Sequence, residues 1–353
     1  MKKRDITRRE FLKGAGAVTL GVAAMSLFGG CATESGSAGG GSKAGGKTVL
    51  AFASDQHAET AGFDAWLADQ QAVFGDELSH LSFAGDICDK EWNQEVFDGF
   101  KAVLDTRMPG KYAVTTGNQE NKAGAPGADW DALGDGFVRL GEAAGTDDYK
   151  IYHLGAAQEA MNFPQADIDA LAAYLSAAPA DIPVFVVSHF PLHLSVATAT
   201  HSIPGGDHRQ AENNAALIEV LNAHPNVIFL WGHNHTFQDP RYGTIRPTGS
   251  KFTYDYYNPT EKIGIGFTYA NIGSFCRGDT YGLIAEISRD SAGVTAKLYY
   301  VDTNVPMETK DSAVLTFSGS AVGVNITPGT AINLAEAQAM SGYPDDPNFT
   351  GEY

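Results

Sequence analysis

Two histidines follow an apolar segment in the second half of the chain. Residues 226–231 (NVIFLW) have the β-branched and aromatic composition of a buried strand, and Gly232, His233 and His235 come after them. Gly232 lets another group approach the backbone closely, and the two imidazoles can serve as metal ligands or as bases. Two nearby histidines are as often structural as functional, so a metal site needs partners elsewhere in the chain.

Four earlier apolar segments also end in residues that can bind metal ions. These segments cover residues 49–54, 81–85, 112–117 and 183–188, and the residues that follow them are Asp55 and His57, Asp86, Asn118, and His189. Open α/β sheets place ligands outside the carboxyl ends of their strands. Five such segments in one chain therefore predict one shared site.

The residue types indicate how this site would bind metal. Asp55 and His57 lie two residues apart, so at a strand end both side chains face one way and can hold one ion. Asp86 has two carboxylate oxygens and can bridge that ion to a second one. Asn118 would add a neutral oxygen and His189 a nitrogen. Ligands of nitrogen and oxygen without sulfur favour Mn, Fe, Zn or Co over Ca or Mg.

The elements that must position these residues alternate along the chain. Apolar residues at spacings of three and four predict helices over 63–74, 91–106, 130–144, 165–177 and 210–223. Strands that alternate with helices are typical of α/β layers. After His235 the pattern predicts strands over 264–275, 280–287 and 294–301, and residues 313–326 could add further strands.

The motifs D-x-H, G-D-x-x-D, G-N-x-E, S-H and G-H-x-H occur in this order, and the set resembles the calcineurin-like metallophosphoesterase superfamily over about residues 48–301. The resemblance implies a metallophosphoesterase-type β-sandwich flanked by helices, an α/β fold in α/β/β/α layers. It implies one ion held by Asp55, His57, Asp86 and His235, and a second ion held by Asp86, Asn118, His189 and His233. Asp89 and Glu120 resemble residues that orient the ligands without contacting metal.

The same resemblance implies an activity. Two divalent or trivalent transition-metal ions would lower the pKa of a shared water, and the metal-bridging hydroxide would attack a phosphomonoester or phosphodiester. Asp86 and Asn118 would belong to this catalytic centre. The protein would then be a metal-dependent phosphoric ester hydrolase that acts on a small phosphate ester.

Gln119 departs from the family pattern, which usually has a histidine after the asparagine of the third motif. That histidine contacts phosphate and is often assigned the leaving-group proton. Glutamine can donate a hydrogen bond to phosphate, but it is not a general acid. The substrate then has a good leaving group, turnover is slow, or another histidine substitutes. The candidates for substitution are His193, His201 and His208, of which we favour His193. The alternative function is a catalytically impaired lipoprotein that contains metal and binds a phosphate ligand.

The amino terminus resembles an export signal. Residues 7–13 (TRREFLK) and the Gly/Ala-rich apolar stretch after them resemble a twin-arginine signal, and residues 27–31 resemble a lipobox that ends at Cys31. We therefore expect a signal peptide over 1–31, a Gly/Ser-rich linker over 32–47, a metallophosphoesterase domain over 48–305 and a C-terminal extension over 306–353. The expected location is the outer face of the cytoplasmic membrane, extracellular or periplasmic, reached through the twin-arginine translocase and held by a lipid on Cys31.

Charge and cysteine content bear on the partners of the protein and on the state of its thiols. The formal net charge is −18, and the first 30 residues are themselves basic, so the exported part is more acidic still. Such a surface repels nucleic-acid backbones, and we expect no nucleic-acid partner. Cys88 and Cys276 could form a disulfide in an oxidising compartment or remain free thiols, and the sequence leaves both possibilities open.

Overall fold

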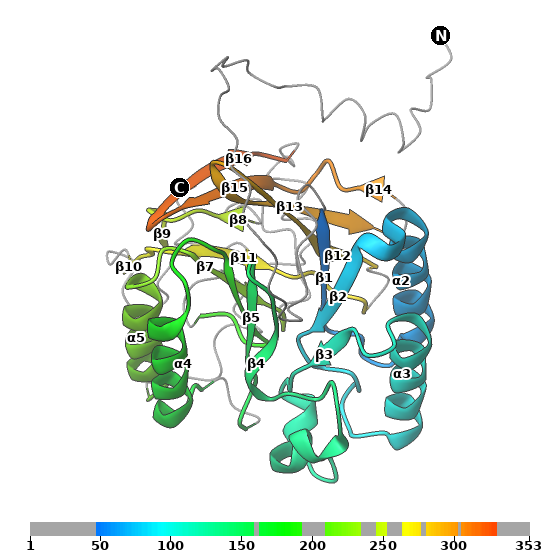
Figure 1. Ribbon diagram of the computed structural model, residues 1–353. Coiled ribbons are helices and arrows are strands. Elements are labelled where there is room, and N and C mark those ends of the chain that lie inside the picture. The colour runs from blue at the N-terminus through cyan, green and yellow to red at the C-terminus, as the bar shows by residue number, and fades with distance from the viewer. Residues whose placement is uncertain are drawn as a thin grey trace, which may run out of the picture. The chain divides into compact units, whose positions relative to one another are not determined.

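The computed structural model describes residues 47–158, 162–192, 209–233, 245–252, 263–276, 280–302 and 305–329 (Figure 1). The expected signal peptide, Cys31, all but the last residue of the expected linker, and residues 330–353 lie outside the described residues. Within the described ranges, no helix has both the length and the hydropathy needed to cross a membrane.

The first sheet combines parallel and antiparallel strands. Its order is β16-β15-β13-β12-β1-β2-β3, with β14 paired to β13. Only β1, β2 and β3 run parallel to one another. The strands are β1 (Thr48–Ala53), β2 (Leu78–Phe83), β3 (Tyr112–Val114), β12 (Gly282–Asp290), β13 (Gly293–Asp302), β14 (Val305–Pro306), β15 (Ser312–Ser318) and β16 (Ala321–Thr327). The segment expected as a C-terminal extension thus contributes β15 and β16 to this sheet.

The second sheet has the order β4-β5-β6-β7-β11-β8, and β5, β6, β7 and β11 are parallel. Two short strands form a separate antiparallel pair. The strands are β4 (Leu140–Gly145), β5 (Lys150–Leu154), β6 (Val184–Ser188), β7 (Val227–Trp231), β8 (Ile245–Arg246) and β11 (Thr268–Asn271), and the separate pair is β9 (Lys251–Phe252) and β10 (Ile263–Gly264).

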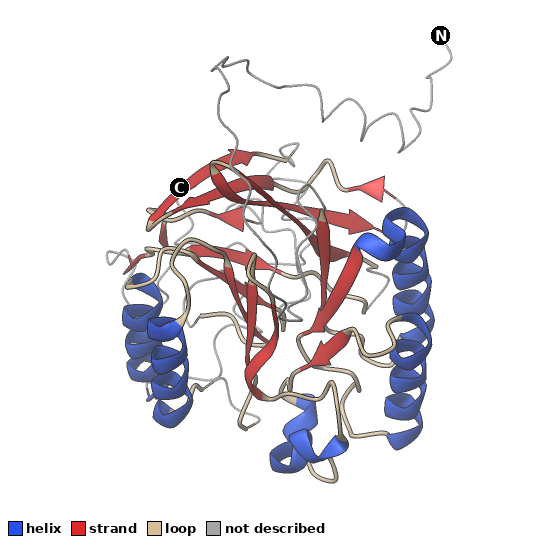
Figure 2. Cartoon of the chain, in the orientation of Figure 1, coloured by secondary structure: helices blue, strands red, loops and turns tan. Residues whose placement is uncertain are grey.

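The two sheets face each other and helices cover their outer faces (Figure 2). Phe52 of β1 and Phe185 of β6 meet between the sheets, with ring centroids 5.1 Å apart. The helices of the first sheet are α2 (Thr60–Phe74) and α3 (Gln94–Arg107), and those of the second are α4 (Gln165–Ala177) and α5 (Arg209–Asn222). Among the described residues, three short 3₁₀ helices connect the main elements: η1 (Gly75–Glu77), η2 (Gln119–Asn121) and η3 (Gly127–Leu133). The predicted fold class, α/β with two helix-flanked sheets, is confirmed.

Buried side chains on the inner face of each helix explain why these segments are helical. Phe63 of α2 and Phe100 of α3 both contact Phe83 of β2, at ring-centroid distances of 5.3 and 4.7 Å. Leu171 of α4 and Leu217 of α5 are fully buried in the corresponding core on the second sheet. Burial of such side chains contributes roughly 1.5–3 kcal/mol each.

Local hydrogen bonding and glycines explain two differences from the predicted helices. Helix α3 begins at Gln94 rather than at residue 91, because the side chain of Asn93 accepts hydrogen bonds from Glu95 N–H and Val96 N–H at 3.0 and 3.3 Å. The helix predicted over 130–144 was wrong. Gly134 and Gly136, with φ values of 108° and 89°, end η3, and Gly141, with a φ of 133°, lies within β4.

Two histidines lie buried near each other on the inner strands. His153 of β5 is fully buried and donates Nδ1–H to the Val138 carbonyl at 2.9 Å, so Ser82 Oγ–H donates to its Nε2 at 2.6 Å. Burial lowers the pKa of His153 to about 4. Burial and the nearby His153 lower the pKa of His80 on β2 to about 3. Both rings are therefore neutral in the folded protein over most of the acid range.

These lowered pKa values predict acid destabilisation. The unfolded chain takes up protons at these histidines near pH 6.5, so their contribution to stability is complete above that pH and is lost as the pH falls toward 4 and 3. At pH 4.5, His80 alone should lower the free energy of unfolding by about 3 kcal/mol. Urea unfolding of wild type and His80→Phe at pH 7 and 4.5 measures this, with the partly exposed His224→Gln as control. An unchanged pH dependence in His80→Phe would contradict the prediction.

Candidate metal centre

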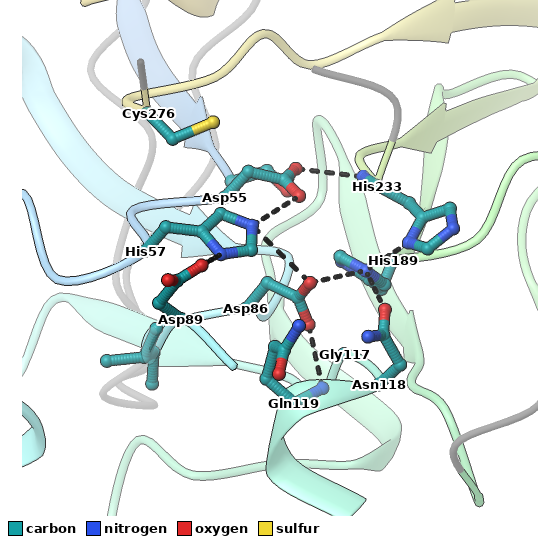
Figure 3. A network of polar contacts seen from close by, with 12 residues as sticks. Asp55, His57, Asp86, Asp89, Gly117, Asn118, Gln119, His189, His233 and Cys276 are labelled. Atoms are coloured by element: carbon teal, nitrogen blue, oxygen red, sulfur yellow. Dashed lines mark hydrogen bonds and ion pairs between the residues drawn. The ribbon is translucent and has the colours of Figure 1, made fainter. Parts of the chain in front are cut away.

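The candidate ligands lie where strands of the two sheets end (Figure 3). Asp55 and His57 follow β1, Asp86 follows β2, His189 follows β6 and His233 follows β7. Because parallel strands point their carboxyl ends the same way, these loops meet at one edge of the sandwich. The structure brings together six of the seven predicted metal ligands, Asp55, His57, Asp86, Asn118, His189 and His233, and the predicted catalytic residue Gln119 lies beside them. His193 and His235 lie outside the described residues.

Asp86 belongs to two overlapping groups of possible metal ligands. In the first group, His57 Nε2 lies 3.6 Å from Asp55 Oδ1 and 3.5 Å from Asp86 Oδ2. In the second, His189 Nε2 lies 3.4 Å from Asp86 Oδ2 and 3.0 Å from His233 Nδ1. Within each group, the possible ligand atoms lie within 4.8 Å of one another. One buried carboxylate shared by two Asp/His groups is an arrangement that can hold a pair of ions.

The tautomer of His189 shows that this donor set suits a cation. His189 Nδ1 lies 2.8 Å from the Ala84 carbonyl, which can only accept, so the proton of the neutral ring is on Nδ1. The Nε2 lone pair then points toward Asn118 Oδ1 at 3.0 Å and the Asp86 carboxylate at 3.4 Å. Three electron-rich atoms that converge in a buried space repel one another unless a proton or a metal ion lies between them.

The negative charges in the site also favour a cation beside the imidazoles. Burial lowers the pKa of His189, but the charges of Asp86, Asp55 and Glu120 outweigh it and raise this pKa to about 9. Burial also opposes protonation of His57, whereas its hydrogen bond to Asp55 and the charge of Asp86 raise its pKa. Without metal, a proton on His189 offsets part of the negative charge of these carboxylates. A metal ion in the same position would displace the proton and take over its charge.

Four of the candidate ligands have a strained backbone. Asp55, His57, Asp86 and His233 have φ values of 57°, 44°, 59° and 67°, and in the described part of the chain the only other non-glycine residue with positive φ is Ala58. Such conformations cost of order 1–3 kcal/mol each, and they cluster at functional sites. Backbone hydrogen bonds hold two of them, from Asp55 N–H to the Gly85 carbonyl at 3.0 Å and from His57 N–H to the Asp86 carbonyl at 3.1 Å.

Glu120 supports the loop that carries Asp86. Its buried carboxylate accepts hydrogen bonds from the N–H groups of Asp86, Ile87 and Gly117 at 2.9, 2.9 and 2.7 Å. Burial and the charge of Asp86 raise the pKa of Glu120, while these three hydrogen bonds act in the opposite direction. Only glycine fits at position 117, because a Cβ there would lie 2.3 Å from Asp86 Oδ1. Glu120 therefore holds the backbone of the loop that carries Asp86 in place.

Gln119 and Asp89 flank the centre. The backbone N–H of Gln119 donates to Asp86 Oδ1 at 2.9 Å, and its buried side chain lies beside the Asp86 carboxylate (Figure 3). Asp89 Oδ1 lies 3.5 Å from His57 Nδ1, and its side chain is 62% exposed. Asp89 thus contacts His57 on the side away from the convergent ligand atoms.

Three contacts at the centre were missed by sequence reasoning. The Ser54 hydroxyl donates to Asp55 Oδ2, and a serine directly before a predicted ligand is a signal that could have been used. The Ala84 carbonyl that orients His189 is a backbone group, so the residue type at position 84 does not indicate this contact. The loop that carries Cys276 is attached by Phe275 N–H to the Asp55 carbonyl at 3.1 Å. Cys276 and Cys88 are both buried, and no disulfide joins them to each other.

The sequence matches no family model and no curated protein. Solved structures do match the chain. The GAP50 anchor of the inner membrane complex of Plasmodium is 12% identical, with a TM-score of 0.45, over 85% of this chain and 95% of its own. A phosphatase of Mycoplasma pneumoniae is 11% identical, with a TM-score of 0.38, over 82% and 99%. The 5'-nucleotidase precursor of Thermus thermophilus is 12% identical, with a TM-score of 0.39, over 83% of this chain and 57% of its own.

At these identities and TM-scores, the neighbours assign no activity to this chain. The molecule itself defines a class. It is an α/β protein with two facing sheets that carries two overlapping Asp/His groups at the carboxyl ends of its strands, where a pair of metal ions can be held.

Proposed function

We propose that this protein is an exported, membrane-anchored hydrolase that uses two metal ions to cleave a phosphomonoester or phosphodiester. The observation that carries the proposal is the Asp86 carboxylate, which is buried and shared by two groups of convergent ligand atoms. Phosphate-ester hydrolysis is a common use of such paired sites. The anionic substrate must reach a protein of net charge −18, so local positive charge at the centre is needed to bind it.

The residues of the chain have distinct tasks in this proposal. Asp55, His57 and Asp86 hold one ion, with His235 completing the set, and Asp86, Asn118, His189 and His233 hold the other. When bound, two ions of Mn, Fe, Zn or Co supply the charge that attracts phosphate and lower the pKa of a water toward neutrality. The Ala84 carbonyl keeps the His189 Nε2 lone pair directed at the centre. Glu120 keeps Asp86 in its strained conformation.

With Gln119 at this position, the leaving group must depart without a proton from residue 119. Its amide can donate a hydrogen bond to a phosphate oxygen, but it carries no transferable proton. We propose that the natural substrate has a good leaving group or that His193 supplies the proton. Either case predicts turnover with glutamine at position 119.

Hydrolysis of aryl phosphates by the metal-loaded protein tests this function. We expect clear turnover by wild type and less than about a tenfold gain in Gln119→His, because the leaving group of an aryl phosphate needs little protonation. The matched control is Gln119→Asn, which keeps an amide but shortens it. A gain of about 100-fold or more in Gln119→His, or tight phosphate binding without product in wild type, would favour the impaired binding lipoprotein instead.

Export and anchoring rest on the first 31 residues, with the twin-arginine pattern at Arg8 and Arg9 and the lipobox that ends at Cys31. In cells that express the full chain, the protein should be found in the membrane fraction, with its domain accessible from outside. Cys31→Ala should release it from the membrane. A membrane fraction unchanged in this variant would contradict the lipid anchor.

A further inference from the structure

Ser54 lies directly behind the first candidate ligand. It follows β1 and is fully buried, and its hydroxyl donates a hydrogen bond to Asp55 Oδ2. The same oxygen accepts the backbone N–H of His233 at 2.8 Å. Two donors, one from each sheet's edge, therefore engage Oδ2. The other oxygen, Oδ1, is the one that faces His57 Nε2 at 3.6 Å (Figure 3).

The space around this contact is closed by the backbone of the second sheet. A Cβ at Gly232 would lie 1.9 Å from Ser54 Oγ and 2.6 Å from Asp55 Oδ2. Gly232 is itself held by its N–H, which donates to the His189 carbonyl at 3.0 Å. The Ser54 hydroxyl is thus enclosed between the loops that carry ligands of both groups, and it is directed at only one of the two Asp55 oxygens.

We propose that Ser54 is a positioning residue that makes Asp55 a one-oxygen ligand of the ion held with His57 and Asp86. The inference rests on the metal centre of the proposed function. The terminal torsion of an aspartate is soft, so a carboxylate without fixed donors can rotate and present either oxygen. Hydrogen bonds to an ionised carboxylate are strong and directional, and the Ser54 and His233 donors select Oδ1 for metal.

The chain contains a matched serine that lacks this contact. Ser188 is also fully buried, ends β6 and directly precedes a ligand, His189. Its Oγ has no hydrogen-bond partner among the described residues. Removal of either hydroxyl deletes one buried oxygen next to a ligand, but only Ser54 contacts the ligand's coordinating group.

The experiment counts ions in Ser54→Ala and Ser188→Ala. The full chain is equilibrated with Mn²⁺, bound ions are measured by elemental analysis after dialysis, and electron paramagnetic resonance shows whether two Mn²⁺ ions are coupled. Wild type and Ser188→Ala should bind two ions and give a coupled spectrum. In Ser54→Ala one ion should bind as in wild type and the other about 10- to 100-fold more weakly, which gives the six-line spectrum of an isolated ion.

Equally tight binding of both ions by Ser54→Ala would overturn the role of Ser54 and leave the proposed function intact. Equal weakening in Ser54→Ala and Ser188→Ala would also overturn it, since the effect would then be one of packing. A wild-type chain that binds none of Mn²⁺, Fe²⁺, Co²⁺ and Zn²⁺ would overturn the proposed function together with this inference. If Ser54→Ala does not fold, Ser54→Thr, which keeps the donor, carries the test: two tightly bound ions support the role, and loss of one refutes it.

Discussion

Asp86→Asn is expected to lower kcat/KM for an aryl phosphate by more than about 1,000-fold and to reduce metal binding at both positions. Asp86 Oδ2 faces His57 Nε2 at 3.5 Å and His189 Nε2 at 3.4 Å, so one charged oxygen serves both groups. Asparagine has no charge, and its NH₂ group would occupy the place of one oxygen. Steady-state kinetics and the number of bound ions per chain measure the two effects together.

Asp89→Asn is the matched control for this substitution. Asp89 contacts His57 Nδ1 at 3.5 Å, but its side chain is 62% exposed and belongs to neither ligand group. We expect a loss of activity of about tenfold to 100-fold, as for residues that orient a ligand from outside. Wild-type activity in Asp86→Asn would refute the metal centre, and so would equal losses in the two variants.

Removal of metal is expected to lower the free energy of unfolding by about 4 kcal/mol, if the free ion was present at about 1,000 times its dissociation constant. The reason is the concentration of buried carboxylates, since Asp55, Asp86 and Glu120 are each 0–1% exposed. A bound cation interacts favourably with these charges in the folded chain and has no comparable site in the unfolded chain. Urea unfolding with saturating metal and with a chelator measures the difference.

The control for metal removal is Asp86→Asn under the same two conditions. It lacks the shared ligand, so a chelator should change its unfolding free energy by less than about 1 kcal/mol. Comparable chelator effects in wild type and in this variant would show that the stabilising ion binds elsewhere. No chelator effect in either protein would argue against a metal centre.

Most of the layered architecture was predictable from apolar spacing, because helices and strands bury one face at a fixed local period. The exception is instructive. Residues 130–144 have helical spacing, yet they form η3 and the strand β4. The apolar spacing depends only on the types of the side chains and says nothing about the backbone. Gly134, Gly136 and Gly141 adopt positive φ values that no helix contains. The glycines, rather than the apolar residues, decide the conformation of this segment.

The sequence by itself determined which residue types end the strands, namely the aspartates, histidines and asparagine that follow β1, β2, β3, β6 and β7. That information is local, since each ligand lies within a few residues of the strand that positions it. Tertiary structure alone decided that Asp86 is shared, that the Ala84 carbonyl sets the His189 tautomer and that His233 N–H meets Asp55. These contacts join residues up to 178 positions apart, so they arise only when the two sheets pack face to face.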